Sequence, residues 1–236
     1  MANSEHIVAS FDDELESIQG MIMRMGGLVE QAIADAARAM DTRDVELAGQ
    51  VRRNDAAIDA LDDQINDAAA SIIARRQPIA SDLRTVLTVF RISNNLERIG
   101  DYAKNIAKRS EAILEHPPVE GTGASLRRMA RQVELMLKDV LDAYIQQDED
   151  KAQDVRERDL EVDQMYSALF REYLTFMMED PRNITTCMHL HFMAKNIERM
   201  GDHATSIAEQ VIYLVSGEMP TDDRPKATDV PLPPSA

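Results

Sequence analysis

The chain contains the same polar pattern twice, at two places far apart in the sequence. Residues 94–109 read NNLERIGDYAKNIAKR, and residues 195–210 read KNIERMGDHATSIAEQ. Both windows hold Glu-Arg-x-Gly-Asp followed by Ile-Ala at the same spacing. A second match, at an offset of 104 residues, relates three residues in each half: Val51, Asp55 and Asp59 with Val155, Asp159 and Asp163. The chain is therefore an internal duplication, and each half must fold into the same kind of unit.

Apolar residues recur at steps of three and four through most of the chain, which is the spacing of one face of an α-helix. The periodic segments are 15–37, 45–76, 80–115, 125–146, 149–179 and 182–215. Aromatic residues make up only 4% of the chain, whereas methionine occurs 14 times, and this balance favours helix packing over sheet. The sequence predicts an all-α fold of six long helices.

The stretch HPPVEGTGA, residues 116–124, is rich in proline and glycine and separates two sets of three helices. We predict a first three-helix bundle over residues 8–116, a linker over 117–124 and a second bundle over 125–217. Short connections make neighbouring helices antiparallel. The end of the chain, 218–236, is polar and proline-rich, which predicts a disordered tail.

Charge and composition exclude several classes of protein. A formal net charge of −16 argues against nucleic acid and is compatible with a basic partner or bound cations. The single Cys187 excludes an intrachain disulfide and a thiolate metal cage. The first residues show no secretory signal, and no apolar run approaches the ~20 residues of a membrane span. We expect a cytoplasmic protein.

Each half carries two acidic pairs at i,i+4 spacing. On a helical wheel, Glu97 and Asp101 fall on the face away from the apolar residues. Like charges at this spacing destabilise a helix by a few tenths of a kcal/mol. Either the adjacent Arg98 and Arg199 or a bound hard cation could offset that cost, and a solvated acidic face is the simpler alternative. We predict metal ligands at eight positions: Asp55, Asp59, Glu97, Asp101, Asp159, Asp163, Glu198 and Asp202.

Two further features bear on the function. Gly100 and Gly201 lie inside predicted helices, where glycine costs ~1 kcal/mol against alanine, so their repetition predicts close helix approach. No phosphate-binding loop, nucleophile elbow or H-E-x-x-H motif occurs, and the Glu-x-x-His motifs of di-iron bundles are lacking. We therefore predict a protein that is not an enzyme. The alternatives are a metal-dependent phosphohydrolase and a purely structural helical scaffold.

Over residues 8–217 the chain resembles the PhoU family of phosphate-specific transport system accessory proteins. The resemblance is carried by FDDELESIQGMIMRMGGLVEQAI (11–33), RQPIASDLR (76–84) and the two repeated windows. It implies two similar three-helix bundles related by a pseudo-twofold axis. It also implies a cytoplasmic negative regulator of phosphate uptake and of the phosphate-starvation (Pho) response.

The resemblance further implies partners and cofactors. The expected partners are the ATPase subunit of a phosphate ABC transporter and a sensor histidine kinase, through which the protein works at the membrane. A homodimer or higher oligomer is expected. Some family members bind iron or zinc clusters through the acidic pairs, which implies iron or zinc here, with magnesium or manganese as alternatives. Asn105 matches the family pattern, whereas Ser206 and Asn54 depart from it.

Overall fold

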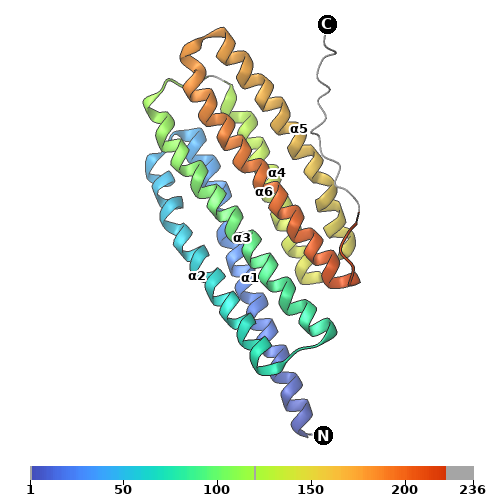
Figure 1. Ribbon diagram of the computed structural model, residues 1–236. Helices are drawn as coiled ribbons and strands as arrows, with labels where there is room; N and C mark the ends of the chain where they lie inside the picture. The colour runs from blue at the N-terminus through green and yellow to red at the C-terminus, as the bar shows by residue number, and fades with distance from the viewer. Residues whose placement is uncertain (1, 120, 222–236) are drawn as a thin grey trace.

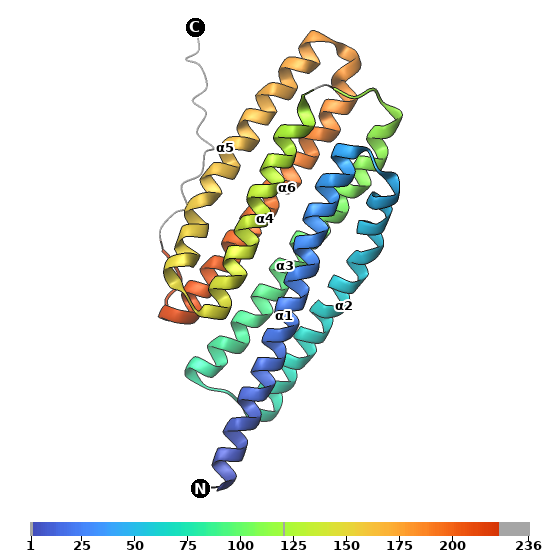
Figure 2. The same ribbon diagram turned by 180° about the vertical axis from the view of Figure 1, so that it is seen from behind.

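The structure is a computed structural model that describes residues 2–119 and 121–221, with side chains placed for residue 11 and from residue 13 onward within those ranges. All regular structure in these residues is helical (Figures 1 and 2). The elements are α1 (Ala2–Thr42), α2 (Val45–Arg76), α3 (Ala80–Ala112), η1 (Ile113–Glu115), α4 (Thr122–Gln146), α5 (Glu149–Glu179), η2 (Pro181–Asn183) and α6 (Ile184–Ser216). The predicted all-α fold of six long helices is confirmed.

The turns between α1 and α2 and between α4 and α5 show the duplication at atomic level. The Leu47 N–H donates to Asp44 Oδ1 at 3.0 Å, and the Lys151 N–H donates to Asp148 Oδ1 at 3.0 Å. The two caps are related by the same offset of 104 residues. An aspartate oxygen at this position satisfies one of the unpaired amide groups of the first helical turn. Each half therefore starts its second helix in the same way.

The helices form two layers. Helices α2, α3, α6 and α5 lie side by side in one layer, and α1 and α4 lie behind them (Figures 1 and 2). The two halves meet where α3 packs on α6 and α1 packs on α4. Tyr102 and His203 occupy equivalent positions in the two halves, and their ring centroids lie 5.7 Å apart at the α3–α6 contact. The pseudo-twofold axis therefore passes close to these two rings.

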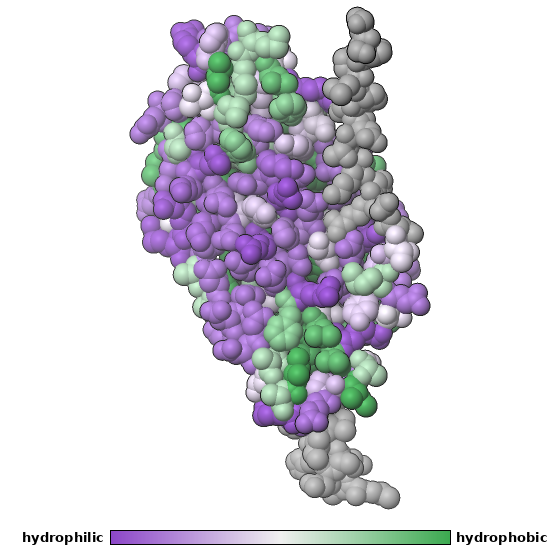
Figure 3. All heavy atoms as spheres, viewed as in Figure 1, coloured by the Kyte–Doolittle hydropathy of each residue, from purple (hydrophilic) through white to green (hydrophobic). Residues whose placement is uncertain are grey.

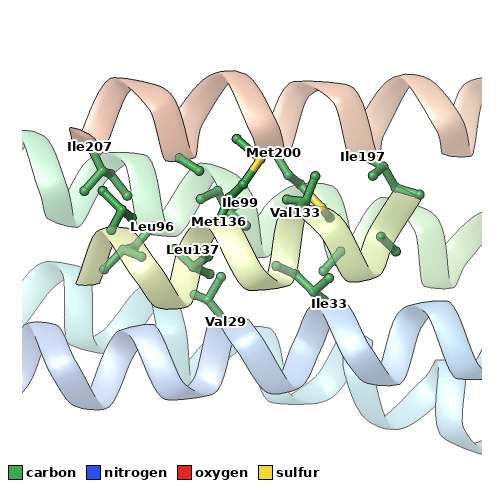
Figure 4. Close-up of a cluster of buried hydrophobic side chains, with 14 of the residues drawn as sticks. Val29, Ile33, Leu96, Ile99, Val133, Met136, Leu137, Ile197, Met200 and Ile207 are labelled. Carbon is green, nitrogen blue, oxygen red and sulfur yellow. The ribbon is translucent and has the colours of Figure 1, made fainter. Parts of the chain in front are cut away.

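One hydrophobic core crosses the boundary between the halves. Buried side chains from four helices meet in the cluster of Figure 4: Val29, Ile33, Leu96, Ile99, Val133, Met136, Leu137, Ile197, Met200 and Ile207. The first two come from α1, the next two from α3, and the rest from α4 and α6. The two bundles thus share one apolar interior, and their division at the linker (8–116 and 125–217) stays a prediction.

The ends of the second bundle differ slightly from the expected boundaries. Helix α4 begins at Thr122, inside the predicted linker, because Gly121 at φ +86° turns the chain and the Thr122 hydroxyl donates to Val119 O at 2.8 Å. Helix α6 ends at Ser216, and Gly217 caps it at φ +85°. Most of the predicted tail, residues 222–236, lies outside the described residues. No helix among the described residues is long and apolar enough to span a membrane.

Candidate carboxylate sites

In the first half, carboxylates from α2 and α3 surround one lysine. Lys104 Nζ on α3 forms an ion pair with Asp55 Oδ2 on α2 and lies 3.6 Å from Asp101 Oδ1. Asp55 is only 4% exposed, so the ammonium group compensates a buried negative charge. Burial raises the pKa of Asp59, and the charges of Asp55 and Asp101 raise it further. The structure therefore brings Asp55, Asp59 and Asp101 together around Lys104.

Glu97 lies at the edge of this group. Burial raises the pKa of Glu97, and repulsion from Asp101 adds to the effect. Arg98 Nε lies 3.6 Å from Glu97 Oε2, and Arg98 Nη1 lies 3.8 Å from Asp101 Oδ2. Since the Arg98 side chain is 53% exposed, these two ion pairs contribute little to stability.

The second half places its carboxylates in the same way but with different cations. Asp159 on α5 is buried, 7% exposed, as its counterpart Asp55 is. Lys195 Nζ lies 2.6 Å from Glu198 Oε1, and Arg199 Nη1 lies 3.9 Å from Asp202 Oδ2. Glu198 and Asp202 are both partly buried, and Asp163 lies half-buried one turn beyond Asp159. The second cluster thus lies on α5 and α6, which are the equivalents of α2 and α3.

The two halves differ at the position of Lys104. Its counterpart is Thr205, which is buried and donates from its hydroxyl to Gly201 O at 2.7 Å. Conversely, Lys195 has the exposed Asn94 as its counterpart. In the first half a lysine ammonium group therefore pairs with the buried Asp55, whereas in the second half it pairs with Glu198.

The repeated glycines allow α2 and α5 to come close to their partner helices. A Cβ atom on Gly100 would lie 3.0 Å from Ile58 Cδ1, and one on Gly201 would lie 3.1 Å from Asp159 Oδ1. An alanine at either position would force the facing side chain to move by a few tenths of an ångström. The predicted close helix approach at both glycines is confirmed.

The expectation that Glu97 and Asp101 face away from the buried surface is wrong in part. The side chains of Glu97 and of its counterpart Glu198 are only 22% and 13% exposed. The helical wheel located the apolar face of α3, which packs on α1. It did not show that α2 packs on a second face of α3, or that α5 packs on the equivalent face of α6. The carboxylates lie along those covered edges.

Lys104 was not among the predicted site residues. It stands three residues after Asp101, the spacing at which side chains on a helix meet, so the sequence contained a usable signal. The histidines whose side chains are described mainly make packing contacts. His189 stacks with His116 at 6.4 Å, His191 lies 5.7 Å from Tyr166, and His203 Nδ1 lies 2.7 Å from Asn95 Oδ1.

Replacing Glu97 with glutamine should raise the melting temperature at pH 7. Burial raises the pKa of Glu97 above 4.5 in the folded protein. The protonated carboxyl therefore stabilises the fold below about pH 4.5, and this stabilisation is lost as the pH rises through the raised pKa. The charge is therefore unfavourable at pH 7, and its removal stabilises the fold. Thermal melts of E97Q and wild type at pH 7 and pH 4 should show a gain at pH 7 that shrinks at pH 4. An equal gain at both pH values would contradict this explanation.

Comparison with known proteins now places the chain. A profile described as the PhoU domain matches residues 22–110 and again residues 126–211. The chain belongs to the PhoU family. The two matched segments are the two halves of the duplication, so each half is one PhoU domain.

Relatives of nearly the same length carry the same name. A protein of Rhizobium meliloti (strain 1021) is 48% identical over 221 residues, which is 94% of this chain and 93% of the relative. A protein of Caulobacter vibrioides (strain NA1000 / CB15N) is 47% identical over 223 residues, 94% of this chain and 97% of the relative. Both are described as phosphate-specific transport system accessory protein PhoU homologs.

Solved structures of PhoU proteins share the fold. The crystal structure of PhoU from Pseudomonas aeruginosa is 40% identical, with a TM-score of 0.85 over 88% of this chain and all of the other. The phosphate transport system regulatory protein PhoU from Streptococcus pneumoniae is 30% identical, with a TM-score of 0.82 over 89% of this chain and 98% of the other. The arrangement of α1 to α6 is therefore that of PhoU.

The first PhoU domain does not fit a bound metal ion as its side chains are placed. Hard cations need several carboxylate oxygens directed at one point. Within the described part of the chain, no group of three or more histidine, cysteine, aspartate or glutamate side chains has that arrangement. In the first half, the Lys104 ammonium stands among Asp55, Asp59 and Asp101, where a metal ion would have to bind. In the second half, the residue equivalent to Lys104 is Thr205, whose side chain is neutral.

Proposed function

We propose that this PhoU protein is an accessory protein of a phosphate-specific transport system. One observation carries the proposal: the proteins with this name match the chain at 40–48% identity and over most of both lengths. The profile matches residues 22–110 and 126–211, and the chain covers 93% and 97% of the two relatives' lengths.

The finer proposal is a negative regulator without catalytic activity. It would act in the cytoplasm as an adaptor between the ATPase subunit of a phosphate ABC transporter and a sensor histidine kinase, and would restrain phosphate uptake and the phosphate-starvation response. The support is the family resemblance, together with carboxylates that the structure neutralises by lysine and arginine rather than arranging around a nucleophile.

Deletion of the gene tests this role. We expect phosphate accumulation and constitutive alkaline phosphatase expression in phosphate-rich medium, both reversed by the wild-type chain on a plasmid. Unchanged phosphatase expression and unchanged phosphate content would overturn the proposal. A phosphohydrolase would instead be revealed by hydrolysis of phosphate esters with added divalent metal by the purified protein, and a purely structural scaffold by full complementation after replacement of all four acidic pairs.

Metal binding is the second candidate function, and the difference between the halves favours the second domain. There, Asp159, Asp163, Glu198 and Asp202 would hold an iron or zinc ion, or magnesium or manganese, after their side chains rearrange. An ion bound by these residues would neutralise their charges and join α5 to α6. In the first domain, the Lys104 ammonium already fills that role for Asp55.

Elemental analysis of the natively purified protein tests this difference. We expect metal content to fall when Glu198 and Asp202 are replaced by alanine, and to stay the same when Glu97 and Asp101 are. This matched pair of double variants changes equivalent residues in the two domains. Equal loss from both pairs would show that the halves are equivalent sites, and a lack of metal under both aerobic and anaerobic purification would remove the candidate.

A further inference from the structure

The linker between the two PhoU domains is tied to both of them. It leaves η1 at the end of the molecule where α5 turns into α6 (Figures 1 and 2). We call residues 116–119 the strap. Arg43, in the turn between α1 and α2, donates from Nη2 to His116 O at 3.0 Å, and the Thr186 hydroxyl of α6 donates to Pro117 O at 3.3 Å. The first domain therefore holds the strap at one residue, and the second domain holds it at the next.

Arg43 also binds the segment that leads into the strap. The same Nη2 atom donates to Ile113 O at 3.2 Å and to Leu114 O at 3.1 Å, which are among the last carbonyl groups before the strap begins. The equivalent of Arg43 in the second half is Gln147, and the two residues share a positive φ, +55° and +50°. The turn is therefore common to both domains, whereas its guanidinium group is particular to the first.

Apolar packing under the strap is incomplete. Pro118 and Val119 of the strap line a cavity of about 290 Å³ together with Met40 of α1 and Leu190 of α6. Protein interiors are otherwise close-packed, and atoms that face a void lose their dispersion contacts on that side. The attachment of the strap therefore depends mainly on its few polar and ring contacts.

One of these contacts is a pair of histidine rings. The ring of His116 in the strap lies 6.4 Å from the ring of His189 on α6, with 28° between the two planes, within the range of attractive ring pairs. Burial lowers the pKa of His189, and the charges of Arg109 and His116 lower it further. The uncharged form of His189 is therefore the one that fits this contact.

Protonation sets the contact against its surroundings. In an imidazolium both ring nitrogens carry a proton, and the Nδ1 atom of His189 is buried without a hydrogen-bond partner. Figure 3 shows apolar side chains gathered at this end of the molecule, whereas its middle is mostly hydrophilic, so a charge here is poorly solvated. Two protonated rings would also repel one another and Arg109.

The other elements packed around His189 supply little compensation. From α5, Tyr173 acts on Cys187 of α6, and burial raises the pKa of both groups, so both stay neutral. The first turn of α4 contains no acidic residue. The strap itself is flanked by the Arg43 guanidinium and by Glu115. Of these neighbours only Glu115 is acidic, and its side chain is exposed to water.

We propose that the strap is a proton-sensitive latch across the two PhoU domains, closed while His116 and His189 are neutral and released from α6 when both are protonated. The sign follows from linkage. Because the folded protein favours the neutral form of His189, the attachment is complete above about pH 6.5 and is lost as the pH falls through the lowered pKa. Release opens the cavity under Pro118 and Val119.

A single tryptophan tests the latch. The chain has no tryptophan, so Val119→Trp reports on the strap alone. Acrylamide is an uncharged quencher, and its quenching constant for this variant should rise about twofold or more between about pH 7.5 and about pH 5.5, on either side of the ordinary histidine pKa. Far-ultraviolet circular dichroism should stay the same. An unchanged quenching constant, or a loss of helix at the lower pH, would overturn the proposal.

Histidine variants in the Val119→Trp chain identify the groups that titrate. His189→Phe and His116→Phe each keep a flat ring but cannot be protonated, so the rise in quenching should disappear in both. His191→Phe is the matched control, because His191 is also half-buried on α6 but packs on Tyr166 and Phe170. It should keep the full rise. A rise that persists in both His189→Phe and His116→Phe would assign the pH response to another group and overturn the latch.

An arginine variant tests how the strap is held. Arg43→Met should give strong quenching of the Val119→Trp chain at both pH values, because the hydrogen bonds to the strap are lost. Arg38→Met, one turn earlier and paired with Asp35 on its own helix, should behave as the parent chain does. Should Arg43→Met fail to fold, Thr186→Val removes the hydrogen bond from the α6 side. Quenching that neither variant changes would show that these contacts do not hold the strap. None of these outcomes depends on the proposed function, since the deletion strain reports on that separately.

Discussion

Replacement of Leu96 with alanine is expected to lower the free energy of unfolding by about 2–5 kcal/mol, the range for leucine deletions in well-packed cores. Leu96 on α3 is fully buried and belongs to the cluster shared by α1, α3, α4 and α6 (Figure 4). Because this cluster crosses the boundary between the two PhoU domains, the loss should destabilise both together. Urea unfolding followed by circular dichroism should show one transition, shifted to lower urea.

The matched control is Leu87→Ala on the same helix. Leu87 is 42% exposed, so its replacement should change the free energy of unfolding by only about 0.5 kcal/mol. Two separate transitions, with only one moved by L96A, would show that the halves unfold independently. That result would favour two independent domains, divided at the predicted linker, instead of one cooperative unit built on the shared core.

Replacement of Lys104 with methionine is expected to lower the free energy of unfolding by about 1–3 kcal/mol. The variant leaves the carboxylate of Asp55, 4% exposed, without its ammonium partner, and a buried unpaired charge is costly. Water can reach part of the site, since the Lys104 side chain is 41% exposed, which limits the loss. Lys108→Met, one turn further along α3 and exposed, should have little effect.

A second change at Asp55 checks the cause of that loss. Combining Asp55→Asn with Lys104→Met removes both charges, and the double variant should be more stable than Lys104→Met alone. The two changes would then be coupled, as contacting residues are. Additive losses from the two single variants would show that the ion pair is not the source of the effect.

The pH dependence of this difference follows from the pKa of Lys104. Its hydrogen bond to Asp55 raises the pKa of Lys104 above 10.5, so the stabilisation is present below that pH and is lost as the pH rises through the raised value. The difference in the free energy of unfolding between wild type and Lys104→Met should therefore have its largest value at pH 7, where Lys104 is charged. It should narrow above pH 10.5, and a constant gap would contradict the assignment.

Most of the fold could be predicted from the sequence because the signals for it are local or repeated. The steps of three and four locate the helices, and the repeated residues show that the two halves are equivalent. Gly100 and Gly201 correctly indicated close helix contacts, since a glycine inside a helix has a cost that packing must offset. A family resemblance in the same segments agreed with these patterns.

The candidate site was predicted less well because it depends on contacts between helices. The eight carboxylates were found from their spacing, but their metal-binding role stays a prediction. The structure places the Lys104 ammonium on Asp55, 49 residues away in the sequence.

The sequence by itself determined the six helices and the duplication, because helix periodicity and repetition are encoded within short segments. Only the tertiary structure decided that the two PhoU domains share one core, that α2 and α5 cover the acidic edges, and which cation neutralises each buried aspartate. Those features depend on which helix faces lie against one another, and helical periodicity leaves the choice of neighbour open.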